Sequence, residues 1–163
     1  MNSHPSTITA FSALGQLFRD YTANKSSPNL LIEKLDSTLI SASNQNKWFT
    51  KENLDFCLRS WGNTLTENNI ARWLSNYRLQ QTTQRLGLVL AGNIPLVGLH
   101  DLLCGLACGY HIEVKYSSKD AVLLPFVVDF LCEKQPEWQG KTHFTDGKLA
   151  QFDRVIAAGS SNT

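Results

Sequence analysis

Hydrophobic residues recur at helical spacing through the first 84 positions of the chain and form short continuous runs after them. In the first part, apolar side chains three and four positions apart predict four amphipathic helices. The N-terminal caps that we expect for three of these helices are Ser6 or Thr7, Thr50 and Thr66. We expect the polar run 41–47 to end the second helix and residues 76–84 to form a linker.

From residue 85 onward, strand-like runs alternate with helical patterns. The expected strands are 86–91, 111–116, 141–144 and 154–158, and the expected helices are 96–108 and 119–133, with a kink at Pro125 and a helical turn over 147–152. Gly109 is expected to stop the first of these helices. Such alternation is typical of a parallel sheet with helices on both faces. The predicted fold class is therefore α/β, a doubly wound, Rossmann-like sheet preceded by a helical segment.

One apolar run, residues 86–109, is long enough to suggest a membrane-spanning helix. Asp101 near its middle would cost about 3 kcal/mol on insertion. Pro95 and five glycines would weaken the helix further. We therefore expect no membrane span, and the run divides into a strand, a tight loop over 92–95 and a buried helix.

The final residues have the pattern of a helix start that follows a strand. Gly159 and Ser160 come directly after the apolar strand 154–158, and the sequence ends at Thr163. Because a parallel strand is normally covered by helices on both faces, we expect an incomplete sheet and a chain that is the N-terminal portion of a larger protein. Exposed strand edges and apolar surface would then favour self-association into a homo-oligomer.

The composition is that of a globular domain without a strongly charged surface. The 163 residues are 42% hydrophobic and 18% charged, with a formal net charge of +1. This balance gives no electrostatic basis for binding nucleic acid. The four cysteines form no C-x-x-C pair, and the N-terminus has no charged region followed by an apolar core. We therefore expect no disulfide framework and no secretory signal, which favours a reducing, cytoplasmic setting.

Three short segments at the ends of strands are candidates for a binding site. They are Gly92-Asn93, Lys115 to Ser118, and Gly159-Ser160. Ligands of open α/β sheets bind beyond the carboxyl ends of the strands, and a helix N-terminus there suits a phosphate or a developing oxyanion. The sequence has neither a Walker lysine nor a G-x-G-x-x-G pattern. On spacing alone, Asn93 as a turn residue and Lys115 as a solvated strand end are equally good interpretations.

His100, Cys104 and Cys108 lie four positions apart, which suggests a metal site. Two neighbours could bind one ion, but three residues spread over two helical turns diverge too far to do so. We therefore expect no metal site and interpret the cysteines as small residues on a buried helix face. Because adjacent residues do not face each other on a helix, we expect His100 and Asp101 to make structural hydrogen bonds rather than a catalytic dyad.

Three blocks in order resemble the acyl-CoA reductases related to bacterial bioluminescence, which belong to the aldehyde dehydrogenase superfamily. The blocks are AGNIPLVGLHDLLC, VKYSSKDAVLLPF and FDRVIAAGSSNT. The resemblance is close over residues 86–163 and loose over the WFTKENL and ARWL segments of the helical part. It implies that residues 1–84 are a helical N-terminal segment. Residues 85–163 would be the first part of an aldehyde-dehydrogenase-like nucleotide-binding domain, truncated at the C-terminus.

The resemblance also implies roles for individual residues. Asn93 matches the asparagine of an N-x-P loop whose amide holds the thioester or aldehyde oxygen. Lys115 matches a lysine that contacts the adenosine ribose, and Gly159 and Ser160 match a pair that approaches the pyrophosphate. Ser118 stands where many NAD-preferring members have a glutamate, so a 2′-phosphate would not be repelled. NADPH is therefore the expected cofactor, with NADH as the alternative.

By resemblance, the expected activity is the NAD(P)H-dependent reduction of a long-chain acyl-CoA to an aldehyde. The nucleophilic cysteine of the family lies beyond the Gly-Ser pair and has no match in this sequence. The four cysteines present, at 57, 104, 108 and 132, are all expected inside helices, whereas an acyl-accepting thiolate needs an exposed, electropositive pocket. We therefore expect the 163 residues alone to be inactive. The alternative, from another class, is a non-catalytic nucleotide-binding or interaction module.

Overall fold

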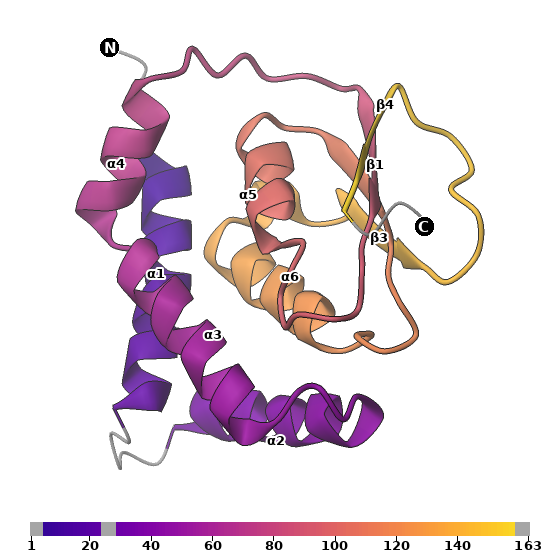
Figure 1. Ribbon diagram of the computed structural model, residues 1–163. Helices are drawn as coiled ribbons and strands as arrows, with labels where there is room; N and C mark the ends of the chain where they lie inside the picture. Colours follow the sequence, from indigo (N-terminus) through magenta and orange to yellow (C-terminus); the bar gives the residue numbers. More distant parts are fainter. Residues whose placement is uncertain (1–4, 24–28, 159–163) are drawn as a thin grey trace.

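The computed structural model describes residues 5–23 and 29–158, which form three layers (Figure 1). The outer layer contains α1 (Pro5–Thr22), α2 (Leu30–Gln45), α3 (Lys51–Thr64) and α4 (Glu67–Ser75). The middle layer contains α5 (Leu99–Ala107) and α6 (Leu123–Lys134), and the third layer is a sheet. Since α1 and α2 pack against α6, the N-terminal helices cover the outer side of the middle layer.

The predicted caps of α3 and α4 are confirmed. The side chain of Thr50 accepts a hydrogen bond from Asn53 N (3.2 Å), and that of Thr66 accepts one from Asn69 N (3.3 Å). Each bond satisfies a backbone donor that the first helical turn leaves free. Residues 77–84 then form the irregular connection to the sheet, as expected of a linker.

For the first two helices, the predicted cap of α1 is wrong and the predicted end of α2 is confirmed. Ser6 and Thr7 do not cap α1, because the helix already includes Pro5, and Thr7 is buried within its first turns. The run 41–47 ends α2 as predicted, because the helix stops at Gln45 and Asn46 caps it. The first residues of the run still belong to the helix, and Ala42 among them packs in the core.

The sheet has four parallel strands in the order β3-β2-β1-β4. The strands are β1 (Arg85–Val89), β2 (His111–Lys115), β3 (Thr142–Thr145) and β4 (Arg154–Ala157). A short 3₁₀ helix, η1 (Pro136–Trp138), precedes β3. Each strand lies within two residues of its predicted range, and the predicted α/β class with an incomplete Rossmann-like sheet is confirmed.

Within the described residues, helices cover one face of the sheet, which corrects the expectation of helices on both faces. The β1–α5–β2 and β2–α6–β3 connections step in the same direction, so right-handed crossovers place α5 and α6 on the same face. The side chains that point to this face are buried: Leu86, Leu88, Ile112 and Val114. The β3–β4 connection steps back past β2 and β1 over the other face, and it contains no helix.

Residues 146–153 cross this second face as an extended loop, so the helical turn predicted over 147–152 is wrong. Leu149 lies over Gly87, where an added Cβ atom would come within 2.8 Å of Leu149 Cδ1. Ala150 N donates to the Glu113 carboxylate (3.2 Å) rather than to a helical carbonyl. A side chain of the sheet thus replaces the internal hydrogen bond that the helical turn would have needed.

The edge strand β4 is poorly covered, as its sequence position predicted. Val155 is 50% exposed and Ile156 is 39% exposed, although both are strongly apolar. Val155 pairs with Gly87 and therefore shares the open face of the sheet with it. This face and this edge therefore present apolar side chains to solvent.

Both helices of the middle layer begin later than predicted. Leu96 has a φ of +55°, and Leu99 N donates to Leu96 O (3.0 Å), so a turn precedes α5. Another turn precedes α6, in which Ser117 O accepts from Asp120 N (2.9 Å) and Ser117 Oγ accepts from Lys119 N (3.3 Å). These local bonds compete with helix formation and delay its start.

A glycine and a proline lie at the boundaries of these helices. Gly109 has a φ of +81° just after α5, which confirms it as the helix stop. Pro125 is the third residue of α6, where a backbone N–H would have no helical acceptor. The kink predicted at Pro125 is therefore replaced by a helix that starts around the proline.

The longest apolar run of the sequence is divided between β1, a loop and α5. α5 has 9 residues, whereas a helix needs about 20 to span a bilayer. Over residues 5–23 and 29–158, none of the helices combines the length and the apolar character that crossing a membrane requires.

Candidate functional site

The loop between β1 and α5 places Asn93 at the carboxyl edge of the sheet. Asn93 and Ile94 are exposed, whereas Pro95 and Leu96 are buried. The positive φ of Leu96 is a conformation that residues with a bulky side chain rarely adopt. Such a backbone persists only where its surroundings hold it, so the loop is shaped by contacts beyond its own sequence.

The loop between β2 and α6 lies directly beside this one. Leu90 N donates to Lys115 O (3.0 Å) where the two strands end. A Cβ atom built on Gly92 would lie 2.4 Å from Ser117 Oγ, so position 92 accommodates only glycine without a shift. Two of the three predicted segments, Gly92-Asn93 and Lys115 to Ser118, are thus brought together.

The predicted cofactor-binding residues differ in their surroundings. Lys115 is half-buried and pairs with Val89, so its side chain belongs to the open face of the sheet. Ser118 is exposed, and Lys119 beside it is exposed as well. The remaining predicted pair, Gly159 and Ser160, lies outside the described residues.

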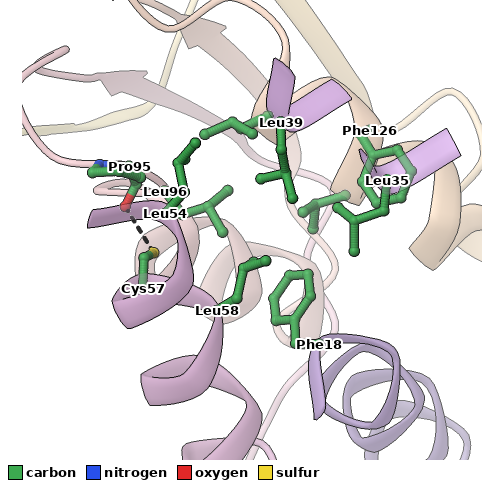
Figure 2. Close-up of a pocket in the computed structure, with 11 residues that line it drawn as sticks. Phe18, Leu35, Leu39, Leu54, Cys57, Leu58, Pro95, Leu96 and Phe126 are labelled. Atoms are coloured by element: carbon green, nitrogen blue, oxygen red, sulfur yellow. Dashed lines mark hydrogen bonds between the residues drawn. The ribbon is translucent and has the colours of Figure 1, made fainter. Parts of the chain in front are cut away.

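Two side chains of the helical part hold the backbone of the Asn93 loop. Asn46, which caps the end of α2, donates from Nδ2 to Gly92 O (2.7 Å). Cys57 of α3 donates from Sγ to Pro95 O (3.2 Å), the bond drawn dashed in Figure 2. The loop is therefore tied on both sides of Asn93 to a part of the chain that precedes it by more than thirty residues.

A buried carboxyl group, Asp120, lies at the other side of the same loop. Asp120 is 7% exposed, and its Oδ1 has no hydrogen-bond partner among the described residues. Burial raises the pKa of Asp120 to about 6, although the backbone amides of Leu123 and Leu96 lower it in part. The carboxylate thus faces both the positive-φ residue of the Asn93 loop and the first turn of α6.

An open pocket lies between α3 and the Asn93 loop. Its volume is about 450 Å³, which is in the range of small-molecule sites. The apolar side chains at its rim include Phe56, which is 76% exposed, and Ile94, which is 55% exposed. Its lining also includes three polar side chains: Asn53, Ser60 and Asn93. The pocket combines an extended apolar wall with a few polar groups, as small-molecule sites do.

A separate cavity at the junction of the layers is too small to bind a ligand. Figure 2 shows side chains from α1, α2, α3, α6 and the Asn93 loop converging around it. Its free volume is about 10 Å³, at the lower limit for one water molecule. Apart from Cys57, its labelled lining side chains are apolar: Phe18, Leu35, Leu39, Leu54, Leu58, Pro95, Leu96 and Phe126. We interpret it as a packing gap where the helical part meets α6.

The four cysteines are half-buried and not activated. Burial raises the pKa of Cys57 to about 12 and that of Cys104 to about 11, and it also raises the pKa values of Cys108 and Cys132. A raised pKa leaves almost no thiolate at neutral pH. Cys108 caps the end of α5 rather than lying inside it, which corrects its predicted position. None of these thiols is suited to accept an acyl group.

His100 and Asp101 are in contact, which corrects the expectation that they do not face each other. His100 Nδ1 lies 3.5 Å from Asp101 Oδ1 in the first turn of α5. His100 also lies 3.8 Å from Cys104 Sγ and packs against the ring of Trp73. Over the described residues, no group of three or more His, Cys, Asp or Glu side chains could hold a metal ion.

Asn46 and Asp120 are the site residues that the sequence did not reveal. Asn46 lies in a polar run that has the appearance of a surface helix end, and Asp120 precedes a helix where a solvated cap is common. Neither residue is near Asn93 in sequence, so only the packing of α2 and α6 brings them to the loop.

No family model, no curated protein and no solved structure matches this chain.

Proposed function

We propose that this chain is the thioester- and cofactor-binding part of an NAD(P)H-dependent acyl-CoA reductase. The observation that supports the proposal most is the position of Asn93, an exposed amide at the carboxyl edge of a parallel sheet and on the lining of an apolar pocket. A side-chain amide in that position can donate to a thioester oxygen as it becomes an oxyanion. The blocks that resemble bacterial bioluminescence reductases include this loop.

The pocket gives the proposal its substrate class. Phe56 and Ile94 offer an exposed apolar wall against which an acyl chain would lose its contact with water. The thioester at the end of that chain would then lie beside Asn93, with the coenzyme A moiety directed out of the pocket. An acyl thioester with a long apolar chain fits this combination better than a small polar substrate.

The β2–α6 loop supports the choice of cofactor. Ser118 carries no charge, and the ammonium group of the exposed Lys119 follows it in the chain. A 2′-phosphate at this loop would meet a hydroxyl and a cation rather than a carboxylate. NADPH is therefore the proposed cofactor, and it supplies the hydride for the reduction.

The proposed reaction requires a thiol that these 163 residues do not supply, because the pKa values of all four cysteines are raised. The thiolate would attack the carbonyl carbon of the acyl-CoA and release the thiolate of coenzyme A. Hydride from NADPH would then add to the carbon of the enzyme thioester, and collapse of the adduct would release the aldehyde and regenerate the thiolate. Asn93 would stabilise the oxyanion in both steps.

The proposal is tested by comparing the affinities of the chain for a long-chain acyl-CoA and for free coenzyme A with titration calorimetry. We expect the acyl-CoA to bind at least tenfold more tightly, and Phe56→Ala to remove most of this preference. Phe152→Ala is the matched control, because Phe152 is also an exposed aromatic residue but does not line the pocket. Equal affinities for the two ligands would overturn the acyl-CoA proposal.

A non-catalytic nucleotide-binding module is the second candidate function, and the raised pKa values of the cysteines favour it. It predicts that NADPH or NADH binds while acyl-CoA and coenzyme A bind no differently from each other. The same titrations therefore separate the two functions.

A further inference from the structure

Asn46 is almost completely buried, and every polar group of the residue makes a hydrogen bond. It is 3% exposed, and its Nδ2 donates to Gly92 O (2.7 Å). Its Oδ1 accepts from Trp48 N (3.0 Å), its backbone N–H donates to Ala42 O, and its carbonyl accepts from Phe49 N. A buried amide with all partners in place has one orientation, because any rotation would leave a donor or an acceptor unpaired.

The bond to Gly92 acts on the peptide group that leads directly into Asn93. The carbonyl carbon of Gly92 is bonded to the nitrogen of Asn93, so fixing Gly92 O also fixes the plane from which the Asn93 side chain projects. The other ties, from Cys57 Sγ to Pro95 O and from Asp120 toward Leu96, act two and three residues beyond Asn93. Of these three contacts, the hydrogen bond from Asn46 therefore acts on the backbone nearest to the Asn93 side-chain amide.

We propose that Asn46 is a positioning residue for Asn93: by holding the Gly92 carbonyl, the end of α2 sets the orientation of the side-chain amide at the pocket. The role in turnover rests on the proposed function, whereas the restraint on the loop does not. The N-terminal helical part would then not only cover α6 but also, through Asn46, set the geometry of a loop in the α/β part.

Replacement of Asn46 by aspartate isolates the bond to Gly92. Aspartate keeps the oxygen that accepts from Trp48 N, and it has nearly the same shape as asparagine. At neutral pH its second oxygen would face Gly92 O as an acceptor against an acceptor, so the tie becomes repulsive. At lower pH the carboxyl group is protonated and can again donate to Gly92 O. Burial favours this neutral form and raises the pH at which it forms.

The test measures backbone order parameters of Asn93, Ile94 and Leu96 by NMR relaxation in the wild type and in Asn46→Asp. We expect the order parameters of these loop residues to fall from about 0.85 in the wild type to about 0.6 in the variant at pH 7. At pH 5 the order parameters of the variant should recover to near the wild-type values. Asp120 faces Leu96 and also titrates between pH 5 and pH 7, and its titratable neighbour, the Cys57 thiol, stays neutral in this range. Each order parameter of the variant is therefore compared with that of the wild type at the same pH. Asn44→Asp, an exposed change in the last turn of α2, is the control and should match the wild type.

A loop in Asn46→Asp that stays as ordered as the wild type at both pH values would overturn the proposal. The same holds for a loss of order that spreads equally over α2 and does not recover at pH 5. If Asn46→Asp does not fold, Asn46→Ser takes its place, since its hydroxyl can accept from Trp48 N but is too short to reach Gly92 O. A loosened loop in a protein that binds no acyl-CoA would support the restraint while contradicting the proposed function, so the two failures are distinguishable.

Discussion

Two loops leave the carboxyl edge of the sheet, and they are held in place in different ways. The β1–α5 loop takes its shape from side chains of other segments, namely Asn46, Cys57 and Asp120. The β2–α6 loop is closed by its own residues, through bonds from Asp120 N and Lys119 N to Ser117. The first loop carries the amide proposed to act on the substrate, and the second carries the residues proposed to contact the cofactor.

The difference indicates where each loop can be altered. A self-closed loop tolerates changes elsewhere in the chain and responds to changes in its own residues. A loop held by distant side chains responds to changes in α2, α3 and the start of α6. The four predictions that follow test this contrast, beginning with the largest expected effect.

Asn93→Ala should lower turnover by about 100- to 1,000-fold in an assembly that supplies the acyl-accepting thiol, because one oxyanion donor is lost. The affinity for NADPH should stay within twofold, since the cofactor is proposed to contact the other loop. Steady-state kinetics and a fluorescence titration measure the two quantities. Asn44→Ala, which does not line the pocket, is the control. Unchanged turnover in Asn93→Ala would reduce Asn93 to a turn residue.

Asp120→Asn should remove a pH dependence of stability that the wild type carries. The pKa of Asp120 rises from 3.8 to about 6 on folding, so the folded state binds the proton more tightly than the unfolded state. The resulting stabilisation is full below about pH 4 and is lost as the pH rises through 6. The free energy of unfolding of the variant minus that of the wild type should therefore increase by about 2 kcal/mol from pH 4 to pH 7.

Urea denaturation of both proteins at several pH values checks this prediction. Subtracting the wild-type free energy of unfolding from that of the variant cancels the titration of the other carboxyl groups. Any destabilisation by the amide that does not depend on pH cancels when this difference is compared between two pH values. A difference that is flat between pH 4 and pH 7 would mean that Asp120 is ionised with an ordinary pKa in the folded protein.

Gly92→Ala should lower the free energy of unfolding by about 1–3 kcal/mol, because the added methyl group overpacks the contact between the two loops. The new Cβ atom would lie 2.4 Å from Ser117 Oγ and 2.6 Å from Ser117 Cβ. Ser117→Gly in the same chain should restore part of this loss, since it removes both atoms. Denaturation of the two single variants and the double variant measures the coupling, and strict additivity would show that the loops do not touch.

Ser118→Glu should weaken NADPH binding about tenfold more than NADH binding, because the carboxylate would repel the 2′-phosphate. Titration of both reduced cofactors by their fluorescence measures the ratio. Lys148→Glu is the control, since Lys148 is an exposed lysine of the β3–β4 connection. Equal losses for NADPH and NADH in Ser118→Glu would exclude contact of this position with the phosphate.

The sequence predicts the sheet better than it predicts the helix boundaries around it. All four predicted ranges overlap their strands, although only β1 is a continuous buried apolar run, whereas β3 (THFT) contains a single large apolar residue. The starts of α5 and α6 were predicted too early, since the positive φ of Leu96 and the turn at Ser117 depend on contacts across the two loops. The helical turn predicted over residues 147–152 does not form, because Ala150 N donates to Glu113, a side chain more than thirty residues away in the sequence.

The candidate site could be predicted only in part for the same reason. Asn93, Lys115 and Ser118 follow from the rule that ligands lie beyond the carboxyl ends of strands. Asn46 and Asp120 reach the loop through the packing of α2 and α6, and neither leaves a local pattern in the sequence. The rule that adjacent helical residues do not face each other excluded the contact between His100 and Asp101, yet their side chains lie 3.5 Å apart in the first turn of α5.

An NMR titration of the isotope-labelled chain with NADPH tests directly whether the carboxyl edge of the sheet binds the cofactor. If the carboxyl edge of β1 and β2 binds the cofactor, the backbone amide signals of Asn93, Lys115 and Ser118 should shift in a saturable manner. Signals at the opposite edge of the same strands, such as those of Arg85 and His111, should stay in place. No shift at millimolar NADPH, or shifts centred on Arg85 and His111, would contradict the assignment of this edge as the binding site.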